Sequence, residues 1–234
     1  MPSTQKVIVV SGCTKGIGFA ICKHFAANGF SVAGYARNVK DINEMQQSFS
    51  KTYPQQQFLF IAADASKKAD VLAFGKKVSE QFLSVEILVN NAGVFLPGSI
   101  IGEADNTLET LMETNVYSAY YLTRSLLPVL KRNVFNMCSI ASLQAYPAGA
   151  SYTISKFALL GFSKQLREEF KNTAVKVTAV MPGAVLTNSW AGVDLPESRF
   201  IKPDDIAKII YSTYLLSDGA DIEELVIRPQ PGDI

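Results

Sequence analysis

Tyr152 and Lys156 are two side chains that could transfer a proton together. They stand four residues apart, so on a helix they share one face and lie one turn from each other. A phenol with an ordinary pKa of about 10 is a poor base at neutral pH, but a neighbouring ammonium favours the phenolate and makes proton transfer useful. The spacing therefore predicts Tyr152 as a general acid and base. The alternatives are an aromatic residue that packs the start of a core helix and a solvated surface lysine.

A glycine-rich segment could bind the phosphates of a dinucleotide. The sequence SGCTKGIG at residues 11–18 follows a short apolar run and opens a stretch of helical period. Glycines at such a turn let backbone N–H groups approach a pyrophosphate, whose charge the helix N-terminus stabilises. Gly18 would let the helix pack against the sheet. Glycine-rich turns also join strands to helices for structural reasons alone, but the position between a first strand and a helix favours the binding function.

The spacing Gly-x-x-x-Gly-x-Gly in this turn resembles the coenzyme motif of the short-chain dehydrogenase/reductase family. Further motifs follow in the order of that family and cover nearly the entire chain: NNAG at 90–93, Asn115, Ser139, YTISK at 152–156, Pro182, Gly183 and Thr187. The chain departs from the family pattern at Ser11, where threonine is commoner, and at residues 131–133, which lack a glycine-rich turn. Neither departure touches the reacting groups.

The resemblance implies an oxidoreductase that transfers a hydride between a nicotinamide coenzyme and a small carbonyl or alcohol substrate. It implies that Tyr152 exchanges the proton, and that Lys156 activates Tyr152 and binds the nicotinamide ribose. Ser139, thirteen residues before Tyr152, is expected to hydrogen-bond the substrate oxygen. Asn115 is expected to anchor a water that relays protons, although an asparagine can also disturb a helix for structural reasons. Ser142 is a rival serine with the wrong spacing. No metal is required.

Residues after the second predicted strand indicate NADP(H) rather than NAD(H). Ala36 stands where NAD-specific relatives usually carry an acid for the ribose 2′-hydroxyl. Arg37 can offer a fork of donors to a 2′-phosphate, and Lys15 is a second cation within the glycine-rich turn. Two bases and no acid therefore predict NADP(H). Asp64 resembles the family aspartate that hydrogen-bonds the adenine, and capping of the next helix is the alternative.

The complete set of predicted coenzyme-binding residues combines the glycine-rich turn with the family motifs. It consists of Gly12, Thr14, Lys15, Gly16, Ile17, Gly18, Arg37, Asp64, Asn90, Ala92, Gly93, Tyr152, Lys156, Pro182, Gly183, Val185 and Thr187.

Apolar and aromatic side chains are expected to line the substrate pocket. The candidates are Leu143, Gln144, Tyr146, Pro147 and Trp190. Such a pocket suits a small ketone, a hydroxy acid or a 3-oxoacyl group almost equally. A different class of function is a catalytically silent protein that senses NADP(H) through occupancy of its site. Such proteins commonly lose the tyrosine or the lysine, and both are present here; a purely structural oligomer is a weaker hypothesis still.

The elements that must position these residues form a regular alternation. Short apolar runs alternate with stretches of helical period, which is typical of a parallel sheet covered by helices on both faces. Strands are predicted at 7–10, 31–35, 58–62, 87–90, 134–138, 175–180 and 225–227, and helices at 17–27, 42–52, 67–82, 108–130, 155–171 and 203–216. The pattern predicts one α/β domain over 1–234, a doubly wound Rossmann-type fold with a parallel sheet of about seven strands in the order 3-2-1-4-5-6-7. The irregular segment 183–202 is expected to form a substrate loop.

Composition argues against several other classes of protein. The 234 residues carry a net charge of +1, so no long-range field would recruit nucleic acid or an anionic membrane. The apolar run near the N-terminus is too short for a signal peptide or a membrane span, and a cytoplasmic location is the default expectation. The resemblance implies a homodimer or homotetramer that pairs through the segments 108–130 and 152–171.

The cysteines and the single histidine suggest no metal site. Cys13, Cys22 and Cys138 show no paired spacing and no nearby histidine cluster, so they are expected to be reduced thiols in or beside the core. His24 lies within a predicted helix. A lone histidine there is expected to be a surface or packing residue.

Overall fold

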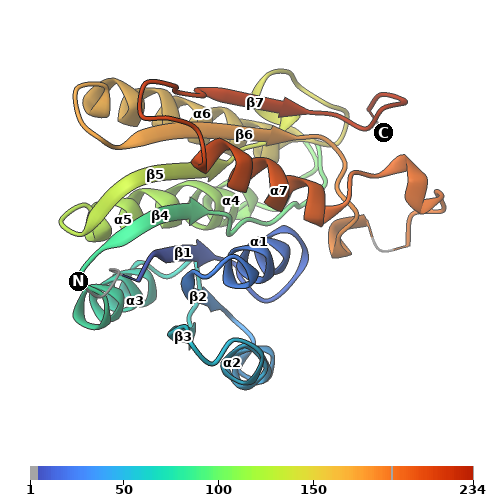
Figure 1. Cartoon of the computed structure of the whole chain (residues 1–234). Coiled ribbons are helices and arrows are strands. Elements are labelled where there is room, and N and C mark those ends of the chain that lie inside the picture. Colours follow the sequence, from blue (N-terminus) through green and yellow to red (C-terminus); the bar gives the residue numbers. More distant parts are fainter. Residues whose placement is uncertain (1–4, 191, 234) are drawn as a thin grey trace.

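Seven parallel strands form the sheet on which the rest of the chain is assembled (Figure 1). The computed structural model describes residues 5–190 and 192–233. The strands are β1 (Val7–Ser11), β2 (Ser31–Ala36), β3 (Phe58–Ala62), β4 (Val85–Asn90), β5 (Leu130–Met137), β6 (Lys176–Pro182) and β7 (Glu224–Ile227). Their order is β3-β2-β1-β4-β5-β6-β7, which confirms the predicted doubly wound topology of a single α/β domain.

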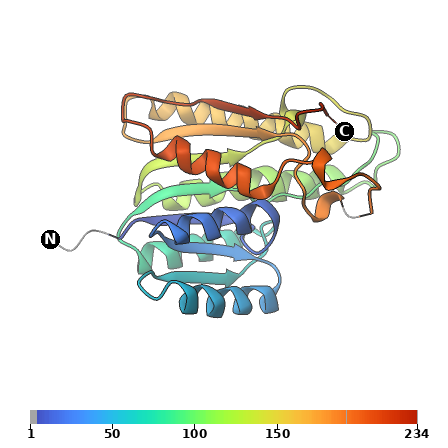
Figure 2. The same cartoon turned by 45° about the vertical axis from the view of Figure 1, so that its right-hand side comes forward.

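Helices cover both faces of the sheet, as Figure 2 shows in a second view. One face carries α1 (Gly16–Ala27), α2 (Val39–Thr52) and α7 (Pro203–Tyr214). The other carries α3 (Lys68–Gln81), α4 (Thr107–Met112), α5 (Ser118–Leu126) and α6 (Ala150–Phe170). Since successive side chains of a strand point to opposite faces, Ile8 and Val10 join the first of these cores while Val7 and Val9 join the second. Burial on both faces explains why the central strand β1 is almost wholly apolar.

The predicted helix over 108–130 was wrong in its continuity and its end. The structure divides it into α4, a π-helical turn at Glu113–Tyr117 and α5, which ends at Leu126. Pro128 has no backbone N–H to continue the helical hydrogen bonds beyond Leu127, and β5 already begins at Leu130 instead of 134. The π turn was not visible in the apolar pattern, which continues smoothly across it.

Helix α6 begins five residues earlier than predicted, at Ala150 instead of 155, so that Tyr152 and Lys156 both lie within it. Its first turn is capped from a distant part of the chain: the Ser151 N–H donates to Glu103 Oε1 at 3.1 Å, and the Ser151 hydroxyl donates to the other carboxylate oxygen. An acid at a helix N-terminus stabilises the helix, but nothing in the local sequence reveals this partner.

The segment 183–202 is anchored to the body of the domain at both ends. Ala184 and Leu186 exchange backbone hydrogen bonds with Ile201, and two short 3₁₀ turns lie between, at Asn188–Trp190 and Glu197–Arg199. The segment lies beside the carboxyl ends of the strands (Figure 1), where open α/β sheets bind ligands. No helix within residues 5–190 and 192–233 is long and apolar enough to cross a membrane.

Candidate active site

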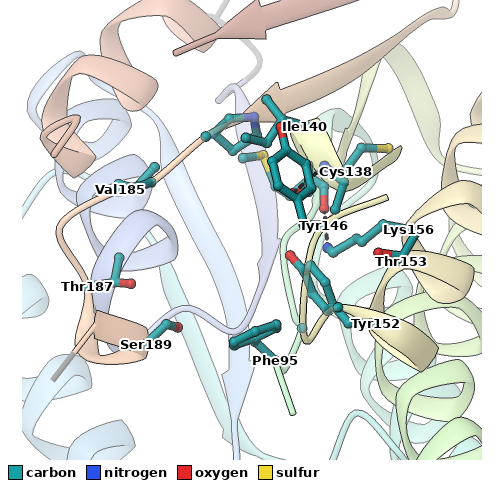
Figure 3. Close-up of a pocket in the computed structure, with 18 of the residues that line it drawn as sticks. Phe95, Cys138, Ile140, Tyr146, Tyr152, Thr153, Lys156, Val185, Thr187 and Ser189 are labelled. Carbon is teal, nitrogen blue, oxygen red and sulfur yellow. Dashed lines mark hydrogen bonds between the residues drawn. The ribbon is translucent and has the colours of Figure 1, made fainter. Parts of the chain in front are cut away.

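The side chains of Tyr152 and Lys156 project from one face of α6 toward the same cavity (Figure 3). The Lys156 side chain is 6% exposed, and its Nζ donates to the carbonyl oxygen of Met137 at 2.8 Å. The ammonium lies 5.6 Å from the centroid of the Tyr152 ring. Phe95 packs edge-on against the opposite part of that ring, with the centroids 4.9 Å apart. The structure therefore brings together the pair that the spacing predicted.

Ser139 follows the end of β5 and lines the same cavity. Its Oγ accepts a hydrogen bond from the Ala141 N–H at 3.1 Å, which leaves the hydroxyl hydrogen free to donate. Ser142 is 1% exposed, and its Oγ accepts from the Ser139 N–H at 3.2 Å. Ser142 thus caps the 3₁₀ turn Ile140–Ser142 and does not line the cavity, whereas Ser139 does.

Asn115 lies in the π turn and uses its amide to join two parts of the site. Its Oδ1 accepts from the Val94 N–H at 2.8 Å, and its Nδ2 donates to the Val94 carbonyl and to Ser155 Oγ at 3.1 and 3.0 Å. These bonds fasten the loop after β4 to the middle of α6. Asn115 therefore has a structural role, which was the alternative to a role in proton relay. The π turn that carries it is a feature frequent at functional sites. A proton-relaying water stays a prediction.

The glycine-rich turn is shaped by close contacts with other loops. Gly12 has φ +66°, a conformation that favours glycine, and a Cβ there would lie 3.1 Å from Ala92 Cα. A Cβ on Gly18 would lie 2.1 Å from the carbonyl oxygen of Gly12, so α1 can pack at this point only with glycine. Gly18 lines neither of the cavities described below; it packs against Gly12 and Asn91 rather than the sheet, and its coenzyme contact stays a prediction.

The N-terminus of α1 is open. Lys15 stands at the N-cap without a side-chain cap, and the first turn contains no acid. The free N–H groups and the positive end of the helix dipole form an anion site. A pyrophosphate fits this site.

The loop after β4 is fastened to the glycine-rich turn by Ser11 and Asn91. The Ser11 hydroxyl oxygen accepts from the N–H groups of Asn91 and Ala92, both at 2.9 Å. In return Asn91 Nδ2 donates to the carbonyls of Ser11 and Gly12 at 2.9 and 3.1 Å. Serine keeps the hydroxyl group of the commoner threonine, and here this hydroxyl holds the two loops together. Sequence reasoning missed Asn91, although its place between two predicted residues was a signal.

The Asn90 side chain is engaged inside the protein. Its side chain is 3% exposed and donates to Thr123 Oγ1 and Asn136 Oδ1 at 2.9 and 2.8 Å. A buried amide needs such partners, and these hold it below the binding face. Asn90 lines neither cavity, and its coenzyme contact stays a prediction.

Two adjoining cavities run across the carboxyl ends of the strands. The first, of about 480 Å³, holds Tyr152, Ser139 and Lys156, and the second, of about 680 Å³, holds the glycine-rich turn. Residues shared by both linings make them one continuous site: Ile17, Asn91, Gly93, Val94, Thr187 and Ser189. An elongated molecule that reaches from the glycine-rich turn to Tyr152 fits this shape.

Most predicted site residues lie where they were expected. The first cavity is lined by Ile17, Gly93, Tyr152, Lys156, Pro182, Gly183, Val185 and Thr187. The second is lined by Gly12, Thr14, Lys15, Gly16, Arg37, Asp64 and Ala92.

The predicted substrate pocket is only partly correct. Tyr146, Pro147 and Trp190 line the first cavity. Leu143 and Gln144 line neither cavity and are exposed, because the chain turns outward after the 3₁₀ turn at Ile140–Ser142. Sequence reasoning missed the apolar wall formed by Val94, Phe95, Pro97, Ile140 and Ala148. The loop segments that supply this wall carry no periodic signal.

The second cavity contains a carboxylate that the sequence did not place there. Lys15 Nζ lies 2.9 Å from Asp41 Oδ2, and both residues line the cavity with Arg37. Asp41 belongs to the first turn of α2. The predicted absence of an acid holds at Ala36, and Asp41 is an additional acid that was not predicted for this cavity.

Asp64 serves the local turn as well as the cavity lining. Its Oδ1 accepts from the Ser66 N–H and hydroxyl at 3.0 and 2.9 Å. Ser66 precedes α3, whose N-cap is Lys67 without a side-chain cap, so Asp64 does not cap that helix. The bonds engage only Oδ1 of the carboxylate.

His24, Cys13 and Cys22 line neither cavity, whereas Cys138 is part of the lining of the first. His24 packs edge-on against Tyr211 with the centroids 5.2 Å apart, and partial burial lowers its pKa. Cys13, Cys22 and Cys138 are buried and free; desolvation raises the pKa of the Cys13 thiol to about 12. Within the described residues, no cluster of histidine, cysteine and acidic side chains could hold a metal ion.

Comparison with known proteins agrees with this architecture. A family model described as short chain dehydrogenase matches residues 6–197. The chain is 29% identical to the sepiapterin reductase of Chlorobaculum tepidum over 98% of each chain. It is also 29% identical to the 3alpha-hydroxysteroid dehydrogenase of Mediterraneibacter gnavus, over 92% of this chain and 91% of that one.

Two solved structures illustrate the likeness in three dimensions. The alcohol dehydrogenase of the archaeon Thermococcus sibiricus, complexed with 5-hydroxy-NADP, aligns with a TM-score of 0.89 at 26% identity over 97% of each chain. The L-sorbose reductase of Gluconobacter frateurii, complexed with NADPH and L-sorbose, aligns with a TM-score of 0.88 at 26% identity over 97% of this chain and 96% of that one. Since the family model spans most of the sequence, the chain belongs to the short-chain dehydrogenase family.

Proposed function

We propose that this protein is an NADP(H)-dependent oxidoreductase that interconverts a small carbonyl compound and its alcohol. The observation that carries the proposal is the placement of Tyr152, Ser139 and Lys156 around one cavity that continues into the glycine-rich turn. The names of the relatives support it, because they include reductases and dehydrogenases, two of which were solved with NADP-type coenzymes.

The residues around the first cavity suit proton exchange with a polarised substrate oxygen. A bound nicotinamide would supply or accept the hydride. The Tyr152 hydroxyl gives a proton to the substrate oxygen during reduction and takes it back during oxidation. Ser139 donates its free hydroxyl hydrogen to the same oxygen and stabilises the charge that develops there.

Lys156 supports Tyr152 through its charge. Its burial limits screening by solvent, so the ammonium favours the phenolate that remains after proton donation. With one N–H bound to Met137, two N–H groups remain for coenzyme ribose hydroxyls. Asn115 holds the loop and helix that frame this arrangement.

The residues present fit an NADP-type coenzyme along the second cavity. The open N-terminus of α1 and the close-packed glycines would bind the pyrophosphate. Arg37 and Lys15 would bind the 2′-phosphate, and the unengaged oxygen of Asp64 would accept from the adenine amino group.

The lining of the first cavity favours uncharged substrates. Among the described residues that line it, Lys156 alone is charged, and most of the others are apolar or aromatic. Because the remaining N–H groups of Lys156 are assigned to the coenzyme ribose, a substrate carboxylate would be desolvated without a charged partner of its own, which is costly. We propose that neutral ketones or aldehydes react better than 2-oxo acids of equal size.

A matched substrate panel tests this function. NADPH oxidation is followed with ethyl esters of 2-oxo acids, the corresponding free acids, and cyclic and aromatic ketones. We expect turnover of neutral members and at least about tenfold lower kcat/KM for each free acid, which corresponds to about 1.4 kcal/mol. Coenzyme binding without turnover of any member would instead favour the catalytically silent sensor. Equal kcat/KM values for esters and acids would reject the preference for neutral substrates but not the oxidoreductase function.

A further inference from the structure

The ion pair between Lys15 and Asp41 lies inside the cavity assigned above to the coenzyme. The two charged atoms are 2.9 Å apart, and the side chains are 61% and 24% exposed. Lys15 extends from the glycine-rich turn before α1, and Asp41 from the first turn of α2. The pair therefore links the two elements that border this end of the cavity.

Asp41 is held in place by its backbone as well as its charge. Its N–H donates to the Asn38 side chain at 3.1 Å, which caps α2. The carboxylate is also favoured at the positive N-terminal end of that helix. Asp41 is thus a fixed negative charge, whereas Lys15 has a long side chain that can turn to another partner.

The charged side chains around this cavity balance one another. Arg37 and Lys15 are positive, and Asp41 and Asp64 are negative. Asp64 is engaged with Ser66, while Arg37 makes no ion pair with any described residue. Of the two cations, only Lys15 is therefore neutralised by an acid within the site.

We propose that Asp41 sets coenzyme selectivity by competing with the 2′-phosphate of NADP(H) for the ammonium of Lys15. This inference rests on the proposed function, because it requires the 2′-phosphate to lie beside Lys15 and Arg37. A bound phosphate must share or displace the carboxylate and also experiences its repulsion. NAD(H) carries a neutral hydroxyl at that position and meets neither cost. Asp41 therefore reduces the difference in affinity between NADP(H) and NAD(H), so that NAD(H) can also bind.

The competing explanation is an exposed ion pair of little consequence, since most such pairs contribute almost nothing to stability. The proposal concerns ligand affinity instead. The adjacent pair of Lys40 and Glu44 on α2 provides the comparison, because Glu44 carries the same charge three residues further on and lines neither cavity.

The test measures dissociation constants of NADP⁺ and NAD⁺, which differ only in the 2′-phosphate, by titration calorimetry. The proteins are wild type, Asp41→Asn, Lys15→Met and the control Glu44→Gln. We expect Asp41→Asn to strengthen NADP⁺ binding about three- to tenfold and to leave NAD⁺ within about twofold. Lys15→Met should weaken NADP⁺ alone, and Glu44→Gln should change neither. The Asp41→Asn effect should shrink at high salt.

The outcomes separate this inference from the proposed coenzyme. If wild type binds NAD⁺ at least as well as NADP⁺ and Asp41→Asn does not reverse the order, the NADP(H) assignment fails. If wild type prefers NADP⁺ but Asp41→Asn leaves the ratio unchanged or lowers it, the role of Asp41 is rejected while the coenzyme stands. Unaltered NAD⁺ binding in each variant shows that the site has folded.

Discussion

The ammonium of Lys156 donates a hydrogen bond to the main-chain carbonyl of Met137, 2.8 Å away. This bond connects α6 to the end of β5, shortly before Ser139 in the sequence. It fixes the lysine charge 5.6 Å from the centre of the Tyr152 ring. A flexible side chain thereby becomes a fixed electrostatic element of the site.

Tyr152→Phe should abolish turnover with little change in NADPH affinity, because the ring still packs against Phe95 but no proton can be transferred. We expect a loss in kcat of about 10²–10⁴-fold. Steady-state kinetics and coenzyme titration measure the two quantities. Tyr117→Phe is the control, since Tyr117 is exposed and lines neither cavity. Retention of more than about a tenth of the activity would remove Tyr152 from the acid/base role.

Lys156→Ala should weaken coenzyme binding and lower kcat together, because one side chain is proposed to bind the ribose and to favour the phenolate. We expect each quantity to fall about tenfold or more. Lys164→Ala, an exposed change on the same helix that removes the ion pair with Glu224, should alter neither. Coenzyme affinity that stays at the wild-type value in Lys156→Ala would contradict the ribose contact.

Arg37→Ala should weaken NADPH binding about ten- to a hundredfold and scarcely affect NADH, because a charged hydrogen bond contributes about 1.5–3 kcal/mol. Ala36→Asp should shift preference toward NADH by placing a carboxylate where the phosphate is expected. Fluorescence titration with both coenzymes measures these changes. Lys40→Ala is the control, because it removes a neighbouring charge outside both cavities. Parallel losses for NADPH and NADH would show that Arg37 does not act on the 2′-phosphate.

The protein should form dimers or tetramers through α5 and α6, as the family resemblance implies. These helices and the π turn expose Tyr117, Tyr120, Ile154 and Phe157, whose burial would favour a two-fold interface. Light scattering at micromolar concentration should give a mass of two or four subunits. Phe157→Asp should lower that mass, whereas Leu83→Asp, at a 97% exposed position after α3, should not. A monomer mass for wild type would reject the prediction.

Stability should fall as the pH drops below the ordinary histidine value. Partial burial lowers the pKa of His24 in the folded state below 6.5, so the unfolded chain binds a proton more readily in that window. The contribution to stability is present above pH about 6.5 and declines toward the lowered folded value. Urea unfolding at several pH values, with His24→Gln for comparison, measures it. The single histidine makes the comparison clean. Identical pH profiles for the two proteins would refute the effect.

The sequence determined the fold because the fold depends on local patterns, while the family resemblance supplied Ser139 and Asn115. Buried strands in a parallel sheet must be apolar on both faces, so β1 and β4 stand out as short apolar runs. Because of the helical repeat, the four-residue spacing places Tyr152 and Lys156 on one face of the helix. Gly18 was predicted from its place in the glycine-rich motif, and the structure shows that helix and turn meet there without room for a side chain.

Tertiary structure alone decided which polar groups are free to act. Asn90 and Asn91 are neighbours in a predicted motif, yet Asn90 hydrogen-bonds to the buried Asn136 while Asn91 bridges two loops. Asp41 enters the coenzyme cavity because α2 begins beside the glycine-rich turn. Glu103 caps α6 from 48 residues away. Partners so distant in sequence leave no periodic signal, because long-range contacts depend on how the loops close over the sheet and not on the repeat of any one element.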